Sequence, residues 1–409
     1  MRPRPLEIEM ATLEEVQRMA TGLVNANDCE GLRKLIMDIM EFDGNKPIAR
    51  AGMSAVCALL DKEVNAFCAE NGQPRLSQEN LQGIPLFVID LIRKCPLKAN
   101  FDESDFVCRK AIFNYNCECG SYSEGATVYC GLNFDSTVRP YSPDEKADIL
   151  VTCAEAFLQD ENNDSAMTMT IKAGQTIGAV ENNTALLLRY RVIRAKVDDA
   201  SRKFLEAARQ YHELSNTVLM NIPLEEKLTL LANAVTCAVL GSAGPQRSRI
   251  LGLLNKDDRL RDLATIPGYQ SHASVLQKMY TERLLSSDEL ATFENTLAAH
   301  QKAITGQGWT IVEKAVIEHN MLAASHIYDN ITFTQLGSLL RLDLHQAERV
   351  AATMITEGRL RATIDQTASL VNFDSENPLQ GWDKRIQDVC NLVSDTVDKV
   401  VARQPELAV

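Results

Sequence analysis

The most constraining feature of the sequence is a degenerate repeat in its middle part. Ala126, Ala166 and Ala208 stand 40 and 42 residues apart, and a large apolar or aromatic side chain follows each of them three residues later. Stacked helical pairs require a small residue where two helices cross and a bulky one a turn later. An earlier helical pattern precedes each alanine, over 106–114, 147–157 and 185–197. The sequence therefore predicts a helical-repeat solenoid, with an unrelated helical bundle as the alternative.

The first hundred residues carry the same helical signal without a visible repeat. Apolar side chains recur in steps of three and four residues between Thr12 and Cys68. Glycine and proline are scarce, with 20 and 13 in 409 residues, so few positions interrupt helices. We expect amino-terminal helical hairpins over 1–100, frayed at the first ten residues, and a helical-repeat arm over 101–300.

The pattern changes after the repeats. A short helix follows Thr332, a candidate N-cap, and a second helix covers 346–357 and stops at Gly358. Two short alternating runs then flank a polar turn, which is typical of a β-hairpin. These runs cover 359–364 and 369–373. Helix, helix and hairpin in this order predict a winged helix, which we place within 301–375.

A final amphipathic helix follows Pro378 and occupies the segment 378–409. Its apolar residues recur every three or four positions: Trp382, Ile386, Val389, Val393, Val397 and Val400. Left in water, these side chains would form a large exposed apolar patch. We expect this helix to dock among helices of partner proteins, and the alternative is that it folds back on its own domain.

Helical repeats that lead into a winged helix resemble the PCI module, which is shared by the proteasome lid, the COP9 signalosome and an initiation-factor complex. Several strings resemble one branch of that family, the fourth subunits of the COP9 signalosome, most clearly over about 200–380. These strings are Ser242-Ala-Gly-Pro-Gln-Arg-Ser-Arg249, His300-Gln-Lys-Ala303, Ala315-Val-Ile-Glu-His-Asn320, Ile331-Thr-Phe333 and Met354-Ile-Thr-Glu-Gly-Arg359. The expected fold is mainly α: a tetratricopeptide-like solenoid, a winged-helix (PCI) subdomain and a carboxy-terminal helix.

The resemblance implies a function as well as a fold. The complexes of this branch remove the ubiquitin-like protein Nedd8 from cullins, and a different, zinc-bearing subunit carries the isopeptidase. Their PCI winged helices associate edge to edge, and their carboxy-terminal helices gather in a bundle. The resemblance therefore implies a non-catalytic scaffold that assembles with the other subunits and helps to hold a cullin–RING ligase. A scaffold subunit of the proteasome lid is the alternative.

Other partner contacts are expected in the second half of the chain. Arg247 and Arg249 extend from a helix that begins near Pro245 and are candidate contacts for an acidic partner. The loop 303–310 holds two glycines and Trp309, which either inserts into a neighbouring subunit or is anchored in its own core.

The predicted wing offers a further contact through its backbone. One strand of the hairpin leaves its outer edge unpaired and accepts a strand of a neighbour, with Arg359, Arg361 and Ile364 as candidate contacts. Whether this strand is 359–364 or 369–373 stays open at this stage.

Residues for enzyme chemistry are not arranged as known sites require. The sequence has six histidines without a His-x-His or His-Glu-x-x-His pattern, and the nearest pair, His319 and His326, is seven residues apart. Cys117 and Cys119 lack a second close pair for structural zinc. The glycines around 241–244 lack the lysine of a phosphate-binding loop. We predict no catalytic residue, no metal and no cofactor, and therefore not an enzyme.

The net charge and the cysteine content bear on the partners and the location of the protein. The net charge is −13, whereas nucleic-acid and anionic-membrane binders need clustered lysine and arginine. The second helix of the winged helix offers only Arg349 against Glu348 and Glu357, so a nucleic-acid adaptor is a second alternative. The start of the chain has no apolar signal core, and eleven cysteines in apolar helical contexts are typical of reduced thiols. We expect a cytoplasmic and nuclear protein.

Overall fold

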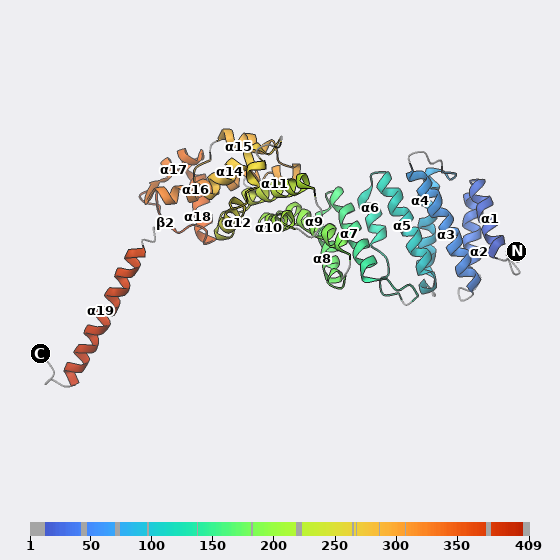
Figure 1. Ribbon diagram of the computed structural model, residues 1–409, viewed down its shortest axis with the longest axis horizontal. Coiled ribbons are helices and arrows are strands. Elements are labelled where there is room, and N and C mark those ends of the chain that lie inside the picture. The colour runs from blue at the N-terminus through green and yellow to red at the C-terminus, as the bar shows by residue number, and fades with distance from the viewer. Residues whose placement is uncertain are drawn as a thin grey trace. The chain divides into compact units, whose positions relative to one another are not determined.

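The computed structural model is mainly helical (Figure 1). It describes residues 13–41, 47–69, 74–95, 98–136, 138–180, 183–217, 223–263, 266, 268–285, 287–306, 308–373 and 378–403. Contacts between residues divide the chain into two units, Met1–Asn221 and Ile222–Val409, and each is described by itself. The division lies inside the arm that the sequence predicts over 101–300, so the last part of that arm shares a unit with the winged helix.

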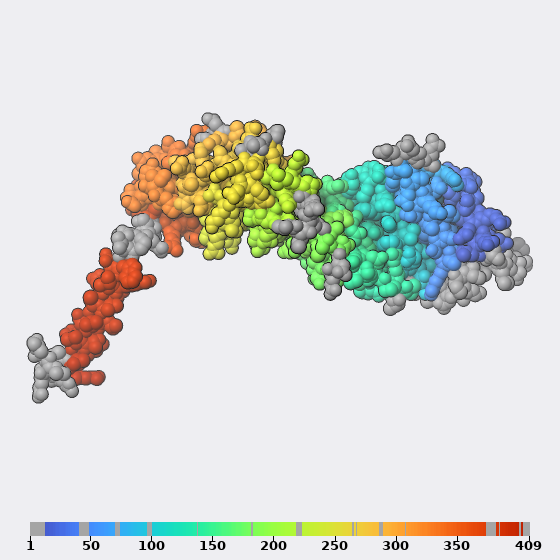
Figure 2. Space-filling view, in the orientation of Figure 1, coloured from blue at the N-terminus to red at the C-terminus, as the bar shows by residue number. Residues whose placement is uncertain are grey.

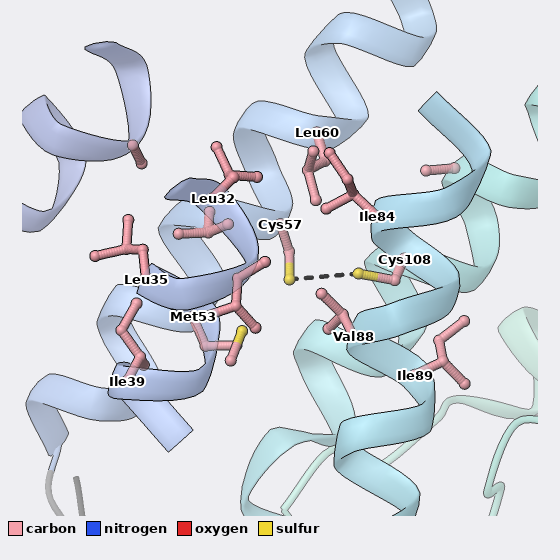
Figure 3. Packing of buried hydrophobic residues seen from close by; sticks show 14 of the residues in the cluster. Leu32, Leu35, Ile39, Met53, Cys57, Leu60, Ile84, Val88, Ile89 and Cys108 are labelled. Carbon is pink, nitrogen blue, oxygen red and sulfur yellow. Dashed lines mark hydrogen bonds between the residues drawn. The ribbon is translucent and has the colours of Figure 1, made fainter. Parts of the chain in front are cut away.

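The first unit begins with four helices that occupy the region of the expected hairpins. They are α1 (Leu13–Asn25), α2 (Cys29–Glu41), α3 (Pro47–Cys68) and α4 (Gln78–Lys94). The inner faces of α2, α3 and α4 meet in an apolar core with α5 (Asp102–Glu118), which Figure 3 shows around Leu32, Met53 and Val88. In this core the thiols of Cys57 and Cys108 lie 3.4 Å apart. Helix α4 runs through Pro85 without a break.

The repeat predicted around the three alanines is confirmed as three helical pairs. The pairs are α5 (Asp102–Glu118) with α6 (Tyr122–Tyr129), α7 (Pro143–Gln159) with α8 (Asn163–Ile177), and α9 (Thr184–Ala200) with α10 (Phe204–Ser215); a short 3-10 turn, η1 (Lys98–Phe101), precedes them. Ala126, Ala166 and Ala208 are all 0% exposed. Figure 1 shows α5, α6 and α7 side by side, in chain order. The small side chain is therefore needed because each alanine lies inside a helix–helix contact.

Local capping explains where several of these helices begin. Ser142 and Glu145 form a reciprocal capping box at the start of α7, and Pro143 occupies its first turn. Asn162 and Asn183 accept backbone N–H groups at the starts of α8 and α9. Asn162 stands between the two helices of one pair, whereas Ser142 and Asn183 stand between successive pairs, so these caps fix turns both within and between the repeats.

The second unit opens with a helical segment before the winged helix. Its elements are α11 (Leu224–Leu240), α12 (Pro245–Asn255), α13 (Leu260–Leu263), α14 (Gln270–Tyr280), α15 (Ser287–Glu294), η2 (Ala299–Lys302) and α16 (Ile311–Ile327). The second half of helix α11 is almost entirely apolar, and it is buried. Pro245 starts α12 immediately after the glycine-containing turn, as the sequence indicates.

A winged helix follows α16 and confirms the predicted order of helix, helix and hairpin. It consists of β1 (Asn330–Thr332), α17 (Phe333–Leu340), α18 (Leu344–Thr356), β2 (Ala362–Asp365) and β3 (Leu370–Phe373). Thr332 caps α17 by accepting the backbone N–H of Gln335. The strands form an antiparallel sheet in the order β1-β3-β2. Strand β1 is absent from the sequence prediction because three residues are too short to show an alternating pattern.

The core of the winged helix lies between its helices, its sheet and α16. Met354 of α18, Phe333 of α17 and Val371 of β3 are buried together with Met321 of α16. Ala243, from the turn between α11 and α12, belongs to the same cluster. The winged helix is therefore packed on the helical segment rather than attached only through the chain.

The last described element is α19 (Pro378–Arg403), the helix predicted at the end of the chain. None of the helices that the structure describes is both long enough and apolar enough to cross a lipid bilayer.

Candidate interaction surfaces

Helix α19 carries the largest group of exposed apolar side chains that the structure describes. The side chains are 45–67% exposed and belong to Trp382, Ile386, Val389, Leu392, Val393, Val397 and Val400. At about 100° per residue they share one face of the helix, and the side chains of α19 stand in solvent along its length (red in Figure 2). The sequence prediction named six of these residues and omitted Leu392, which broadens the stripe on one side.

The sheet of the winged helix leaves one edge of the hairpin open. Strand β3 pairs with both β1 and β2, so the stretch 369–373 is the central strand and has no free edge. In the described part of the chain, the outer edge of β2 pairs with no other strand. The open edge therefore belongs to the first hairpin strand, where Thr363 is exposed and Ile364 packs partly against the core.

The loop before α16 presents a different residue from the one that the sequence singled out. Trp309 is partly buried and packs against the core of the winged helix. Its carbonyl oxygen accepts hydrogen bonds from the backbone N–H and the hydroxyl of Thr305, at 2.7 and 2.8 Å. Ile304 is 70% exposed on the same loop. Partial burial of Trp309 favours the interpretation as an anchor in its own core, and Ile304 is the exposed apolar side chain of this loop.

A cavity of about 410 Å³ lies beside Trp309 within the second unit. Its polar lining comes from Glu313, Asn320 and Arg341, whereas its apolar lining comes from α15, α16 and the end of α17. The volume is in the range of small-ligand sites. The sequence gives no signal for it, because its walls come from segments far apart in the chain.

Arg247 and Arg249 have different environments, which corrects the prediction that both extend from α12. The residue Arg247 is 3% exposed, and its guanidinium donates to the carbonyl of Gly241 at 3.2 Å. Burial is the main cause that lowers the pKa of Arg247 to about 10. Arg249 lies exposed on the surface of α12. Helical periodicity did not show this difference because the burying elements come from later in the chain.

Arg359 is also not a surface contact of the wing, contrary to the prediction. Its side chain is only 15% exposed and forms two hydrogen bonds with the carboxylate of Glu318 on α16. A further bond, 2.7 Å from Nε, joins it to Glu357. Arg361, two residues later, is exposed. Of the candidate arginines, Arg249 and Arg361 are thus the ones on the surface.

The described residues include no group of three or more His, Cys, Asp or Glu side chains able to hold a metal. His319 is buried and His326 is exposed beside Glu282, 3.0 Å away. Burial raises the pKa of Cys117 to about 11, and this keeps the thiol protonated at neutral pH.

Two family models match the chain. Residues 273–375 match the PCI domain, and residues 95–221 match the family described as PSMD12/CSN4, N-terminal. The first match contains the winged helix and the second contains the three helical pairs.

Curated relatives match over most of the chain. COP9 signalosome complex subunit 4 of Drosophila melanogaster is 38% identical over 312 residues, which are 76% of this chain and 74% of the relative. The subunit 4 protein of Arabidopsis thaliana is 32% identical over 392 residues, 94% of this chain and 93% of the relative. That of Dictyostelium discoideum is 36% identical over 290 residues, 71% of each chain.

Proposed function

Since the chain belongs to the family of COP9 signalosome subunit 4, we propose that it is a non-catalytic scaffold subunit of a COP9 signalosome. In this role it supports the removal of Nedd8 from cullin–RING ubiquitin ligases, while another subunit performs the isopeptidase chemistry. It assembles with the other subunits and helps to hold the cullin–RING ligase, and it acts in the cytoplasm and the nucleus.

The observation that carries the proposal is the exposed apolar face of α19. A stripe of seven large apolar side chains is costly to leave in water, because each exposed side chain forgoes the roughly 1.5–3 kcal/mol that full burial supplies. Helices from other polypeptides that cover this stripe recover that free energy. The open outer edge of β2 supports a second contact, since its backbone groups accept a neighbouring strand.

The two units suit a scaffold for different reasons. The helical pairs of the first unit form a stack of repeats, and such stacks offer extended surfaces for large partners. The second unit carries the exposed stripe and the open strand edge. Holding the ligase is therefore assigned to the first unit, and attachment to the complex is assigned to the second.

Quantitative mass spectrometry of proteins that copurify with the tagged full-length chain tests the proposal. We expect the remaining signalosome subunits in near-equal amounts, together with cullins in smaller amounts. Recovery of proteasome-lid subunits in their place would support the alternative scaffold. Recovery of the chain alone, as a stable monomer, would contradict both.

A further inference from the structure

Three charged residues and a neutral histidine inside the second unit form a joint between the helical segment and the winged helix. We propose that Glu318, Arg359, Arg247 and His319, called here the charged joint, are positioning residues that fix the winged helix against the turn between α11 and α12. The joint lies in the interior of the second unit, so its proposed role is to position the winged helix. Its consequence for assembly rests on the function proposed above.

Glu318 is the centre of the joint because one carboxylate connects three segments. Its side chain, on α16, is 5% exposed. Arg359, just before β2, reaches both carboxylate oxygens through Nη1 and Nη2, at 2.5 and 3.1 Å. The backbone N–H of Ala243 donates to the same carboxylate at 3.3 Å. Such paired, charge-assisted hydrogen bonds fix direction as well as distance.

Arg359 also closes this arrangement on the side of the turn. Its Nη1 donates to the carbonyl oxygen of Ala243, 3.3 Å away. The backbone N–H of Ala243 therefore donates to Glu318, and its carbonyl accepts from Arg359. Both backbone groups of Ala243 are bound by the joint. The methyl group of Ala243 lies in the core of the winged helix. The turn between α11 and α12 is thus held through its backbone and its side chain.

Arg247 and His319 extend the joint deeper into the helical segment. Nη2 of Arg247 lies 3.3 Å from Nδ1 of His319, and Nε2 of the same ring lies 2.8 Å from the carbonyl oxygen of Arg283. The only tautomer that satisfies both contacts is neutral, with its proton on Nε2 donated to Arg283. His319 therefore accepts from Arg247 and connects α16 to α12 and to the segment after α14.

The next residue of α16 makes a parallel connection. Asn320 accepts the backbone N–H of Leu285 at 3.0 Å and donates to its carbonyl at 3.5 Å. Three consecutive residues, 318–320, thus bind the backbones of two other segments, the turn before α12 and the stretch 283–285. Residues 318–320 and three of the residues joined to them, Ala243, Arg247 and Arg359, come from the strings 242–249, 315–320 and 354–359. Strings separated by about 40 to 70 positions in the sequence meet at one place in the fold.

Apolar packing alone does not set orientation as sharply as this arrangement. Side chains at an apolar contact can slide with little change in buried area, whereas buried hydrogen bonds to charged groups are lost when their geometry changes. We therefore assign the orientation of the winged helix, and hence of the open β2 edge, to the charged joint. Loss of Glu318 is expected to loosen that orientation while the apolar core of the winged helix persists.

A distance measurement on the purified full-length chain tests this assignment. Nitroxide labels on non-canonical amino acids replace Gln246, exposed on α12, and Ala368, exposed in the turn between β2 and β3. Double electron–electron resonance then reports the distribution of distances between the helical segment and the wing. We expect a narrow distribution for the parent and a broadened or shifted one for Glu318→Ala and for Arg359→Met. Glu318→Gln, which keeps an acceptor, should lie in between.

The control removes a carboxylate from the same unit outside the joint. Glu282 forms an exposed pair with His326, so Glu282→Ala should leave the distribution narrow. An unchanged distribution in Arg359→Met and Glu318→Ala would overturn the proposal. If Glu318→Ala fails to fold, Arg359→Met decides the outcome, because it keeps the length of the side chain and removes the bond from the wing side.

Assembly provides a second readout that separates this inference from the proposed function. In a reconstituted complex, Glu318→Ala should weaken incorporation of the chain about tenfold, a coupling of the size seen for buried residues that act on a distant contact. If the parent chain joins no complex, the proposed function fails while the distance measurement still tests the joint. If the distances change and incorporation does not, the inferred effect on assembly is wrong.

Discussion

Two histidines in the interior of the second unit, His272 and His319, are held neutral by their surroundings. Nε2 of His272 lies 3.0 Å from the hydroxyl of Thr236, among the rings of Tyr269 and Phe293. Burial lowers the pKa of each histidine from 6.5 to about 4, and the nearby charge of Arg247 contributes for His319. Between pH 6.5 and pH 4 these histidines therefore bind protons in the unfolded chain but stay neutral in the folded chain.

Stability should fall as the pH falls below 6.5. Each histidine contributes fully above pH 6.5, and its contribution is lost progressively as the pH approaches 4. Urea titrations at pH 7 and pH 5.5 should show a loss of about 1 kcal/mol per histidine, in a range where most carboxylates stay ionised. The variant His272→Phe should lose about half of this pH dependence. Equal free energies of unfolding at the two pH values would contradict the prediction.

Single residues also show the limit of reading a sequence for partner contacts. Arg247 and Arg249 are two positions apart and look alike in the sequence, yet one is buried and the other exposed. Arg359 binds a carboxylate 41 positions away. A charged residue can be buried when a residue of another segment pairs with it, and the local sequence pattern does not indicate that pairing.

At the scale of the element, the repeat depends on small residues at helix crossings. Replacing Ala166 on α8 with leucine should destabilise the first unit by about 2 kcal/mol, because the added carbons have no free volume in a close-packed contact. Thr168 is exposed on the same helix, so Thr168→Leu is the matched control and should change stability little. Chemical denaturation followed by circular dichroism measures both. Similar stabilities for the two variants would argue against a crossing at Ala166.

Helix α19 is the element to which the proposed function assigns attachment. The double variant Val393→Asp/Val397→Asp places two carboxylates on the apolar face, one turn apart, where partner helices would have to bury them. We expect incorporation into the complex to be lost in copurification, while the isolated chain keeps its helical circular dichroism and melting temperature. The exposed position of both valines explains why folding should be spared.

A matched control distinguishes the apolar face from added charge alone. Gln387 and Asn391 are exposed, one turn apart, on the opposite face of α19. Gln387→Asp/Asn391→Asp should therefore assemble like the parent. Assembly that survives in both double variants would refute docking through the stripe, and loss in both would point to a general effect of charge.

At the scale of the whole molecule, chemistry is expected to come from another chain. The sequence has no closely spaced histidine pair of the kind a zinc isopeptidase uses. The purified chain should not cleave Nedd8 from a modified cullin with or without added zinc, as judged by gel mobility of the cullin. The reconstituted complex is the positive control. Cleavage by the chain alone would show that the scaffold role is incomplete.

The net charge of −13 leads to a second expectation for the whole molecule. Phosphate binding depends on clustered cations, and the second helix of the winged helix has few. Mobility-shift assays with duplex DNA and RNA should show no complex at physiological salt. A salt-sensitive shift at low protein concentration would support the alternative that the chain is a nucleic-acid adaptor.

Most of the fold was predictable because it rests on local periodicity. Apolar spacing gave the helical pairs, the order of helix, helix and hairpin gave the winged helix, and the stripe gave α19. The boundaries of elements and the short elements were harder to predict from the sequence. Strand β1 is too short for a pattern, and helix α18 begins at Leu344 rather than Gln346, since its cap at Asp343 lies just outside the apolar period.

The sequence by itself determined which helices form and which of their faces are apolar, including the stripe along α19. These properties depend on residues within a few turns of one another. Only the tertiary structure decided that β3 is the central strand, that Trp309 packs against the core of the winged helix, and that Arg247 and Arg359 point inward. Those outcomes depend on hydrogen bonds and packing between segments far apart in the chain, which periodicity along a single segment does not encode.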